Sequence, residues 1–436
     1  MNPRFPEILT APRGRHFAAT GILHARRLDL FARVAFLFLW LFVFSVPWED
    51  SILIPSFGTA ARAIGVAAFG FGVLGVIDRG YINWPSEGFL LLAVFVAWSA
   101  ATYFWSVSPE LTAVRIGTYC QLLGVAFLMS QFCSGRQRLT RLIQAYLLGT
   151  CVSSLDTIIH YYLKRESVYQ RYAATGFNAN DLGIILALSL PFSCQMAAAS
   201  RGLRSWLYRL HLVVAITAIF LTASREALVA SFVALGILPV AALLRGSRAV
   251  AAALVTGGIA FGAVCFIVPE TSWQRLNTLT ADATDGTIGL RRPIWAAGLE
   301  VFPSRPLLGV GSGAYGESVA ASLGRAKGEE VNAHSTYLSI LVECGLVGLS
   351  IVILLVFVIA RHVVALPSAR RMLWTFCLLA LATGMTCATW EHRKPTWVFL
   401  NLCLVESACS VSRSPRRRLL AERRGYPKES VVLHHY

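Results

Sequence analysis

The chain has 436 residues, of which 56% are hydrophobic and only 14% charged, and its mean hydropathy is +0.60. Soluble proteins are about one quarter charged, so this composition excludes a soluble protein and indicates one that crosses a membrane many times. The formal net charge of +16 is interpreted as a signal of membrane orientation, with some attraction to anionic lipid head groups. It gives no reason to expect a nucleic-acid partner.

Apolar windows recur along almost the whole sequence. An α-helix needs about 20 apolar residues to cross a hydrocarbon core about 30 Å thick. We therefore predict an all-α polytopic membrane protein of about twelve transmembrane helices, with centres at residues 32–46, 63–77, 89–103, 118–132, 145–159, 182–196, 212–222, 228–244, 251–268, 337–360, 373–390 and 397–411.

Lysines and arginines of the short connections predict the orientation, because positive residues stay on the cytoplasmic side of a membrane. The segments "SGRQRLTR" and "SRGLRSWLYR" are basic, and so is the tail "SRSPRRRLLAERR". We expect both termini to lie in the cytoplasm. The predicted order is a basic cytoplasmic N-terminus at 1–31, helices one to nine at 32–268, a large external loop at 269–335, helices ten to twelve at 336–411 and a basic cytoplasmic tail at 412–436.

The ten cysteines lie in or beside apolar windows and form no Cys-x-x-Cys pair. None lies between residues 266 and 343, so the largest loop has neither a disulfide framework nor a thiolate metal site. We expect the cysteines to be small buried hydrophobic residues.

Several arginines stand on the side of the membrane where few are expected. Arg171 lies in the polar stretch 161–181, and Arg291 and Arg292 begin "RRPIWAAGLEVFP" in the large loop. Arg225, in "LTASREALVA", stands between two apolar windows. A guanidinium at that depth costs free energy unless it faces a cavity or a partner.

Two explanations remain open for Arg225. It can form a salt bridge with Asp181, Glu226 or Asp156, or extend its charge to the interface. Alternatively, the arginines bind an anionic ligand, since the planar guanidinium matches phosphate oxygens in pairs. Several of them at one membrane face would suit a lipid diphosphate.

The large loop carries two further patterns. Residues 291–303 place apolar side chains at helical spacing, with Pro293 near the expected helix start, so Arg291 and Arg292 would stand at a helix N-terminus that favours anions. We expect this short amphipathic helix to lie on the bilayer or to cap the bundle. Downstream, "GVGSGAYG" matches G-x-G-x-x-G but lacks the preceding strand of a dinucleotide site. A tight turn that allows close backbone approach is the favoured interpretation.

The stretch "VNAHSTYLSILVECGLVGL" sets His334 at the external end of the tenth window and Glu343 within it. Glu343 would lie about 13 Å further along a continuous helix, at 1.5 Å per residue. A neutral histidine can accept a proton from a hydroxyl nucleophile, although a lone interfacial histidine is also common as a packing residue. Glu343 is expected to anchor a neighbouring element by hydrogen bonds.

The order "GFNANDLGIILALSLP", "LTASREALVA", "RRPIWAAGLEVFPSRPLLGVGSGAYG" and "AHSTYLSILVECGLVGL" resembles the O-antigen ligase and polymerase superfamily, over roughly residues 170–360. The resemblance implies a glycosyltransferase, without metal or cofactor, that works at the periplasmic face of the bacterial inner membrane, so the large loop 269–335 would be periplasmic. It would move a glycan from an undecaprenyl diphosphate donor to an acceptor hydroxyl, which is a sugar of lipid A core in ligases and the end of another lipid-linked repeat unit in polymerases. We favour the ligase.

By this resemblance the essential loop histidine falls on His334, and the arginines that bind the diphosphate fall on Arg225 and on Arg291 or its neighbour Arg292. Arg171 is expected to join them. Neutralised by these arginines, the diphosphate leaves without a protonating acid, while the histidine deprotonates the acceptor hydroxyl for one inverting displacement. Supporting roles are expected for Asn178, Asn180, Asp181 and Glu343.

The chain departs from the family pattern at two points. Ser335 follows His334 where many relatives have asparagine, and "NAND" replaces an asparagine-proline-asparagine form. These differences bear mainly on Asn178, Asn180 and Asp181. Two further functions are weighed: a transporter of lipid-linked glycan, which would show related halves and interrupted helices, and a protein O-oligosaccharyltransferase, whose relatives commonly carry an additional C-terminal soluble region.

Overall fold

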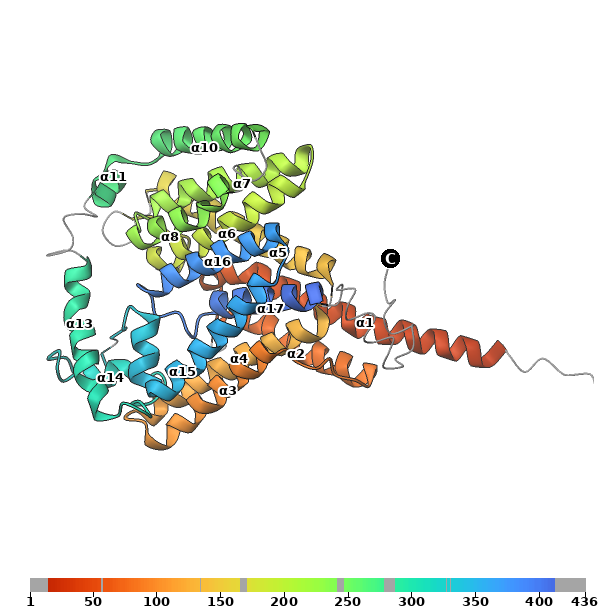
Figure 1. Ribbon diagram of the computed structural model, residues 1–436, viewed down its shortest axis with the longest axis horizontal. Coiled ribbons are helices and arrows are strands. Elements are labelled where there is room, and N and C mark those ends of the chain that lie inside the picture. Colours follow the sequence, from red (N-terminus) through yellow and green to blue (C-terminus); the bar gives the residue numbers. More distant parts are fainter. Residues whose placement is uncertain are drawn as a thin grey trace, which may run out of the picture.

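Long α-helices make up the body of the structure (Figure 1), which is a computed structural model. The described residues are 15–55, 58–133, 135–164, 171–240, 247–277, 287–326, 328–329 and 331–411. The predicted basic tail 412–436 and the first part of the predicted N-terminus, residues 1–14, lie outside the described residues.

The elements follow one another with short connections, apart from one long segment between α10 and α15. The helices are α1 (Arg15–Ser45), α2 (Ala60–Arg79), α3 (Glu87–Ala101), α4 (Pro109–Phe132), α5 (Arg136–Tyr162), α6 (Ala179–Ala199), α7 (Leu203–Leu221), α8 (Arg225–Leu235), α10 (Ser247–Ile267), α11 (Glu270–Asn277), α13 (Thr287–Val301), α14 (Tyr315–Val319), α15 (Thr336–Val364), α16 (Ser368–Met385) and α17 (Lys394–Val411). Three 3₁₀ turns, η1 (Val46–Ser51), η2 (Thr102–Trp105) and η3 (Phe302–Ser304), and a two-stranded hairpin, β1 (Leu53–Ile54) with β2 (Gly58–Thr59), complete them.

Each of the twelve predicted windows overlaps one of these helices, and the last four residues of the eighth window, 241–244, lie outside the described residues. Among the described residues, eight helices are long and apolar enough to cross a membrane: α1 to α7 and α15. The polytopic all-α class is therefore confirmed. The count of twelve stays a prediction, because α8, α16 and α17 are shorter or more polar and α10 includes residues whose side chains are not described.

α6 forms the centre of the bundle, and nearly all of its side chains are buried. It packs against α5, α7, α8 and α16. Glycines permit the closest of these contacts: a Cβ on Gly183 would lie 2.5 Å from Ala227 Cβ in α8, and one on Gly384 would lie 2.7 Å from Ile184 Cγ2. The first turn of α6 is thereby held against the connection between α7 and α8.

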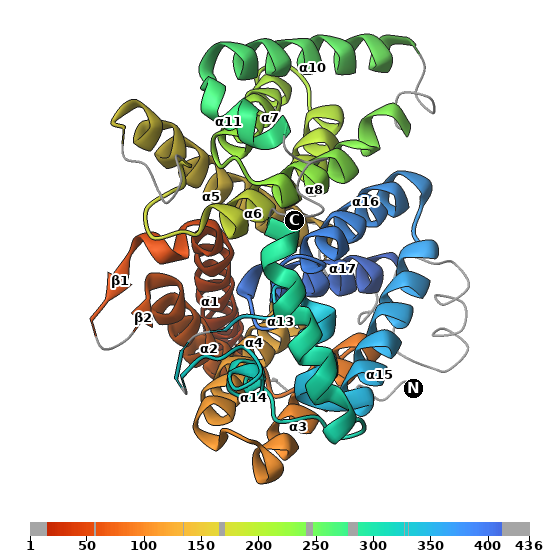
Figure 2. The same ribbon diagram turned by 90° about the vertical axis from the view of Figure 1, so that its left-hand side faces the viewer.

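The long segment crosses one end of the bundle. α13 stands across the helix ends at the left of Figure 1 and lies in front of α15 and α4 in Figure 2. This agrees with a helix that caps the bundle. One expectation was wrong: the helix begins at Thr287, with Pro293 inside it, so Arg291 and Arg292 are not at its N-terminus. Proline removes one backbone N–H donor, but packing can hold the helix in place, and Tyr315 of α14 packs in one cluster with Ala297 of this helix.

α15 is broken at Gly345, whose φ of 67° is in the left-handed region. The loop before α14 inserts at the break. Val310 N and Gly311 N donate to the carbonyls of Val342 and Glu343 at 3.0 Å, and Leu346 N donates to Pro306 O at 2.9 Å. Irregular backbone at the level of a membrane helix needs such partners, because lipid offers none.

The glycines of the G-x-G-x-x-G match serve this insertion. A Cβ on Gly311 would lie 2.1 Å from Ser106 Oγ, and one on Gly313 would lie 3.0 Å from Arg115 Cβ. Gly316 approaches the backbone of Val331 in the same way, with its Cβ position 2.9 Å from Val331 O. The favoured interpretation, a turn built for close backbone approach, is confirmed.

Candidate active site

The turn between α7 and α8 presents Arg225. Thr222, Ala223 and Ser224 form the turn, and Ala223 has a φ of 45°, which is unusual for a residue with a Cβ. The hydroxyl of Ser224 accepts from Ala227 N at 3.3 Å and so caps α8. Arg225 is therefore the first residue of its helix, half-buried at the end of the bundle.

Arg171 is bound to the same turn. Its Nε donates to Thr222 O at 2.8 Å, and its Nη2 donates to Asn180 Oδ1. Asn178 caps α6, because its Oδ1 accepts from Asn180 N at 2.8 Å. Arg171, Asn178 and Asn180, predicted separately, thus belong to one hydrogen-bonded group.

Asp181 lies one residue further along α6 and contacts another part of the chain. Its carboxylate accepts from Trp390 Nε1 at 2.7 Å and from Arg393 Nη2 at 3.2 Å. One of the alternatives for Arg225 was a salt bridge with Asp181, Glu226 or Asp156. The charge-pair partner that the structure records for Asp181 is Arg393.

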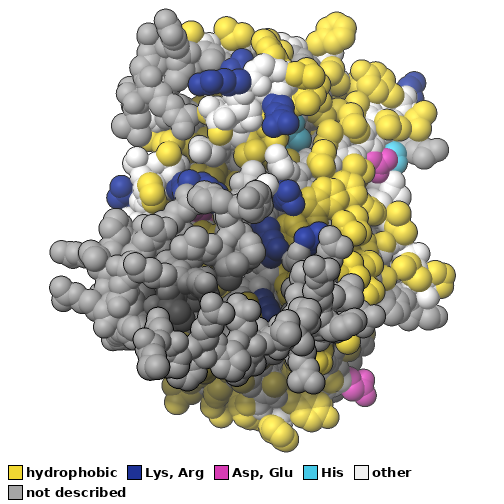
Figure 3. Space-filling view, turned by 90° about the vertical axis from the view of Figure 1, so that its right-hand side faces the viewer, with side chains coloured by type: hydrophobic (Ala, Val, Ile, Leu, Met, Phe, Trp, Pro, Cys, Tyr) yellow, Lys and Arg dark blue, Asp and Glu magenta, His cyan; other side chains and the backbone are white. Residues whose placement is uncertain are grey.

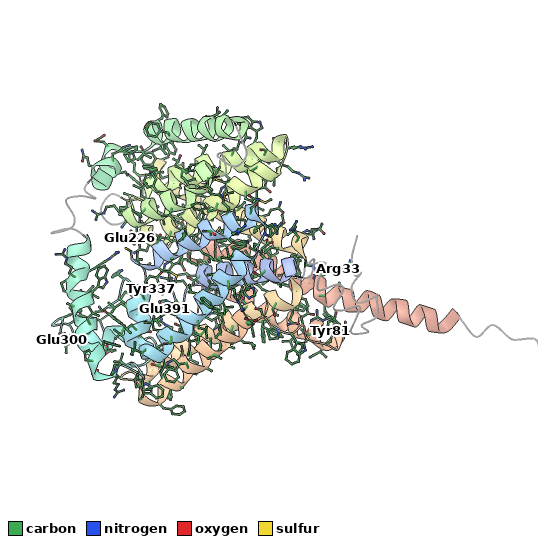
Figure 4. The ribbon with its side chains drawn as sticks, viewed as in Figure 1. Arg33, Tyr81, Glu226, Glu300, Tyr337 and Glu391 are labelled. Carbon is green, nitrogen blue, oxygen red and sulfur yellow. The ribbon has the colours of Figure 1, made fainter. Side chains whose placement is uncertain are left out.

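Arg291 forms a buried ion pair with Glu226. Nη2 of Arg291 bonds Oε1 of Glu226, and the two side chains are only 6% and 11% exposed. This pair joins α13 to α8 across the end of the bundle. In Figure 4 the label of Glu226 stands beside the upper end of α13. Arg292, the neighbouring candidate, is exposed. The two arginines therefore differ: Arg291 is held within the structure and Arg292 faces outward.

His334 is held in an unusual conformation just before α15. Its φ is 48°, so it is one of three residues other than glycine with positive φ among the described residues. The residues on either side are fixed: Trp295 Nε1 donates to Ala333 O at 2.9 Å, and Thr336 Oγ1 donates to Ala388 O at 2.7 Å. Ser335 also caps α15 through Leu338 N. Strain of this kind persists only where the surroundings enforce it, and it is common at functional sites.

Charges around His334 act on its imidazole. Burial lowers the pKa of His334 below its ordinary value, and the positive charge of Arg291 lowers the pKa further, while Asp181 partly opposes both. A lowered pKa keeps the ring neutral at neutral pH, which is the form that accepts a proton. His334, Arg291 and Asp181 thus act on one another electrostatically.

Glu343 does not belong to this group by its contacts. Its carboxylate accepts from Gly313 N at 2.7 Å and from Tyr315 N at 3.4 Å, and it lies 3.9 Å from Arg115 Nη1. It anchors the inserted loop and α4, which fits the anchoring role expected from the sequence.

Residues 210–353 match the family model described as O-antigen ligase. For this segment, the match supports the O-antigen ligase superfamily. The resemblance stated from the sequence is confirmed, and members of this family are glycosyltransferase-like enzymes. The matched segment contains Arg225, Glu226, Arg291 and His334, whereas Arg171 and the first turn of α6 lie before it. No curated protein matches the sequence.

A turn beyond the O-antigen ligase domain also reaches the site, and sequence reasoning missed it. The segment from Trp390 to Lys394 connects α16 to α17. Glu391 Oε1 accepts from Arg115 Nη1 at 2.7 Å and from Ser339 Oγ at 3.3 Å, which binds the turn to α4 and α15. Figure 4 shows Glu391 beside Tyr337, close to where α15 begins. The signal was available: "EHRK" places four polar or charged residues in a connection expected to be external.

Two hollows lie beside the candidate site. An apolar groove of about 370 Å³ lies between α13 and α15 and is lined by Trp295, Leu299, Ser335 and Leu338. A larger cavity of about 470 Å³ lies between α1, α2 and α4 and ends at the turn that carries Arg393. Within the described residues, no group of three or more His, Cys, Asp or Glu side chains could hold a metal ion. Metal independence stays a prediction.

Proposed function

We propose that the protein is an O-antigen ligase, which transfers a glycan from undecaprenyl diphosphate to a sugar hydroxyl of lipid A core at the periplasmic face of the inner membrane. The observation that carries this is the strained conformation of His334 within the segment that matches the O-antigen ligase family model, together with the buried Arg291, whose charge acts on the imidazole. A proton acceptor and a fixed cation beside it are the two groups that displacement of a diphosphate by a hydroxyl requires.

In this proposal His334 is the general base. Its neutral imidazole takes the proton of the acceptor hydroxyl as the oxygen attacks the anomeric carbon of the donor sugar. Burial and Arg291 keep the imidazole neutral at neutral pH, because both lower its pKa. A base whose pKa lies near or below the working pH is present in its active form.

The arginines bind the leaving group. Arg291 and Arg225 would neutralise the diphosphate while the bond from the anomeric carbon to phosphate breaks, and Arg292 would contact it from the exposed side of α13. Arg171 would act through the turn of Thr222, to which it is hydrogen-bonded. Diphosphate leaves as an anion and needs no proton, so one base suffices and the configuration at the anomeric carbon inverts.

The remaining predicted residues would position these groups. Asn178 and Asn180 hold Arg171 and the start of α6, and Asp181 holds Trp390 and Arg393. Glu343 fixes the inserted loop that follows α13. Their substitution is expected to weaken activity through geometry rather than abolish proton transfer.

The experiment uses purified protein in nanodiscs, with lipid-linked glycan and lipid A core, and separates products on a gel. Transfer to lipid A core is expected for wild type and is expected to fall by roughly 10²- to 10⁴-fold in His334→Ala, the range for loss of a general base. Arg225→Ala is also expected to lose transfer, and a chelator is expected to have no effect.

His362→Ala is the matched control, because His362 lies near the other end of the same helix, α15. Lengthened lipid-linked chains without transfer to lipid A core would replace the ligase by a polymerase. Wild-type transfer by His334→Ala would contradict the general-base role.

A further inference from the structure

The cavity of about 470 Å³ between α1, α2 and α4 has two chemically different ends. Towards the middle of the helices it is apolar, with Phe42, Val66 and Phe69 in its walls. At the end that meets the connection between α16 and α17 it is charged, with Asp50, Arg62 and Lys394 among its lining residues. An amphipathic cavity in the wall of a membrane bundle fits a lipid with a polar head rather than a soluble molecule.

The charged end is joined directly to the proposed active site. Arg393 lines the cavity, and its Nη2 donates to Asp181 Oδ2 at 3.2 Å. Asp181 in turn acts on the imidazole of His334. A head group in the cavity would therefore reach the proposed site through Arg393 and Asp181.

The charges at this end are mixed. Lys394 is paired with Glu49 and Arg393 with Asp181, while Asp50 and Arg62 add one further charge of each sign. Carboxylates repel a diphosphate but accept hydrogen bonds from hydroxyl groups, while the Lys and Arg cations donate hydrogen bonds to the oxygens of those hydroxyl groups. This composition favours a sugar-bearing head group over the diphosphate of the donor.

The second hollow suits the donor better. The groove between α13 and α15 is lined by Trp295, one turn beyond Arg291, and by Ser335, next to His334. Its walls are almost entirely apolar, as an uncharged polyprenyl chain requires. The two hollows thus offer separate paths to the proposed site, one through Ser335 and one through Arg393.

We propose that the cavity between α1, α2 and α4 binds the acceptor glycolipid, with its acyl chains against α2 and α4 and its sugar hydroxyls at Asp50 and Arg393. The assignment rests on the proposed function, since it identifies the acceptor with lipid A core. It adds a substrate site built mostly from helices outside the O-antigen ligase domain.

The first test needs no catalysis. Cys120 lies in α4, lines the cavity and is exposed, whereas Cys265 in α10 is exposed elsewhere and serves as the internal reference. Wild-type protein in nanodiscs is labelled with N-ethylmaleimide, and labelling is measured by peptide mass spectrometry. Added lipid A core is expected to slow the labelling of Cys120 severalfold and leave Cys265 unchanged. Protection by undecaprenyl diphosphate instead, or by neither lipid, would overturn the assignment.

The second test fills the cavity. Gly124 lines it, and a side chain there would meet the ring of Phe69, which stands 3.3 Å from the Cβ position. Gly117, in the same helix, has no atom within 4 Å of its Cβ position and lies outside the cavity. Gly124→Leu is expected to raise the concentration of lipid A core needed for half-maximal transfer by roughly tenfold, because the leucine side chain would take up apolar wall surface that the lipid contacts. Gly117→Leu is expected to leave it unchanged.

The two variants also separate the inference from the proposed function. An increase in the donor requirement of Gly124→Leu, rather than the acceptor requirement, would assign the cavity to the polyprenyl lipid and overturn the inference. If wild type transfers nothing to lipid A core, the proposed function fails, and the labelling of Cys120 still decides whether the cavity takes the glycolipid.

Discussion

At the scale of single residues, the site depends on backbone conformations that side chains with a Cβ rarely adopt. His334 and Ala223 both have positive φ, and each directly precedes a helix that carries a predicted functional group. The hydrogen bonds on either side, from Trp295 to Ala333 and from Thr336 to Ala388, hold His334 in place. A flexible loop would leave the imidazole in several orientations, so this strain is consistent with a preorganised base.

The pH dependence of transfer tests the environment of His334. The neutral imidazole is the active form, so the rate should be constant at neutral pH and fall as pH drops through a pKa that lies below its ordinary value of about 6.5. Asp181 raises that pKa, so Asp181→Asn is expected to move the acid limb to lower pH. The measurement is kcat/KM against pH for both proteins. An acid limb unmoved by Asp181→Asn would contradict the electrostatic link between these residues.

The buried pair of Arg291 and Glu226 is expected to be needed for stability. Glu226→Ala leaves the guanidinium buried without its partner, which typically costs about 3–5 kcal/mol. Thermal unfolding in detergent should show a clear loss of stability, partly restored when Arg291→Met is added. Arg292→Ala, at the exposed neighbouring position, should change the free energy of unfolding by no more than about 0.5 kcal/mol. Equal effects of Glu226→Ala and Arg292→Ala would argue against the pair.

At the scale of elements, the break in α15 joins the long loop to the helix bundle. A continuous helix would close its own hydrogen bonds, but the left-handed Gly345 interrupts it and frees carbonyls for the loop from Pro306 to Gly311. Glu343 then accepts from the loop through Gly313 and Tyr315. The loop that follows α13 is in this way built into the bundle, and α13 is held over the start of α15.

Gly345→Ala tests this insertion. An added Cβ would lie 2.2 Å from Leu307 O, and the residue has a φ of 67°. We expect a loss of more than about 2 kcal/mol, because both strain and a backbone clash are introduced. Limited proteolysis should show earlier cleavage between residues 302 and 315. Gly70→Ala, where nothing lies within 4 Å of the Cβ position, is the control; similar protease resistance in both variants would contradict the insertion.

At the scale of the whole molecule, the two ends of the bundle differ. The end crossed by α13 holds the predicted site residues (Figure 1). At the opposite end, viewed in Figure 3, the described residues that can be seen include Lys and Arg side chains in dark blue among hydrophobic ones. This distribution is what the positive-inside rule expects of a cytoplasmic face. A site on the other end would then face the periplasm, where a lipid-linked glycan could reach it.

The orientation can be measured with reporters. Alkaline phosphatase fused after Tyr436 is expected to be inactive, whereas the same enzyme inserted between residues 277 and 287 is expected to be active, because alkaline phosphatase folds only in the periplasm. Green fluorescent protein at the same two positions should give the reverse pattern. Active phosphatase at the C-terminus would reverse the predicted topology and would place the site in the cytoplasm.

The sequence alone determined the class of the protein and many of the residues that matter. A hydrophobic window predicts a membrane helix from local composition alone, so each predicted window overlaps a helix. Misplaced arginines were also visible, because a charge in an apolar stretch is costly wherever the chain goes. Only the tertiary structure decided that Glu226 pairs with Arg291, that Asp181 pairs with Arg393, and that the turn after α16 reaches the site. These partners are 65 and 212 residues apart, and which charges meet depends on how helices pack, a long-range property that no local pattern records.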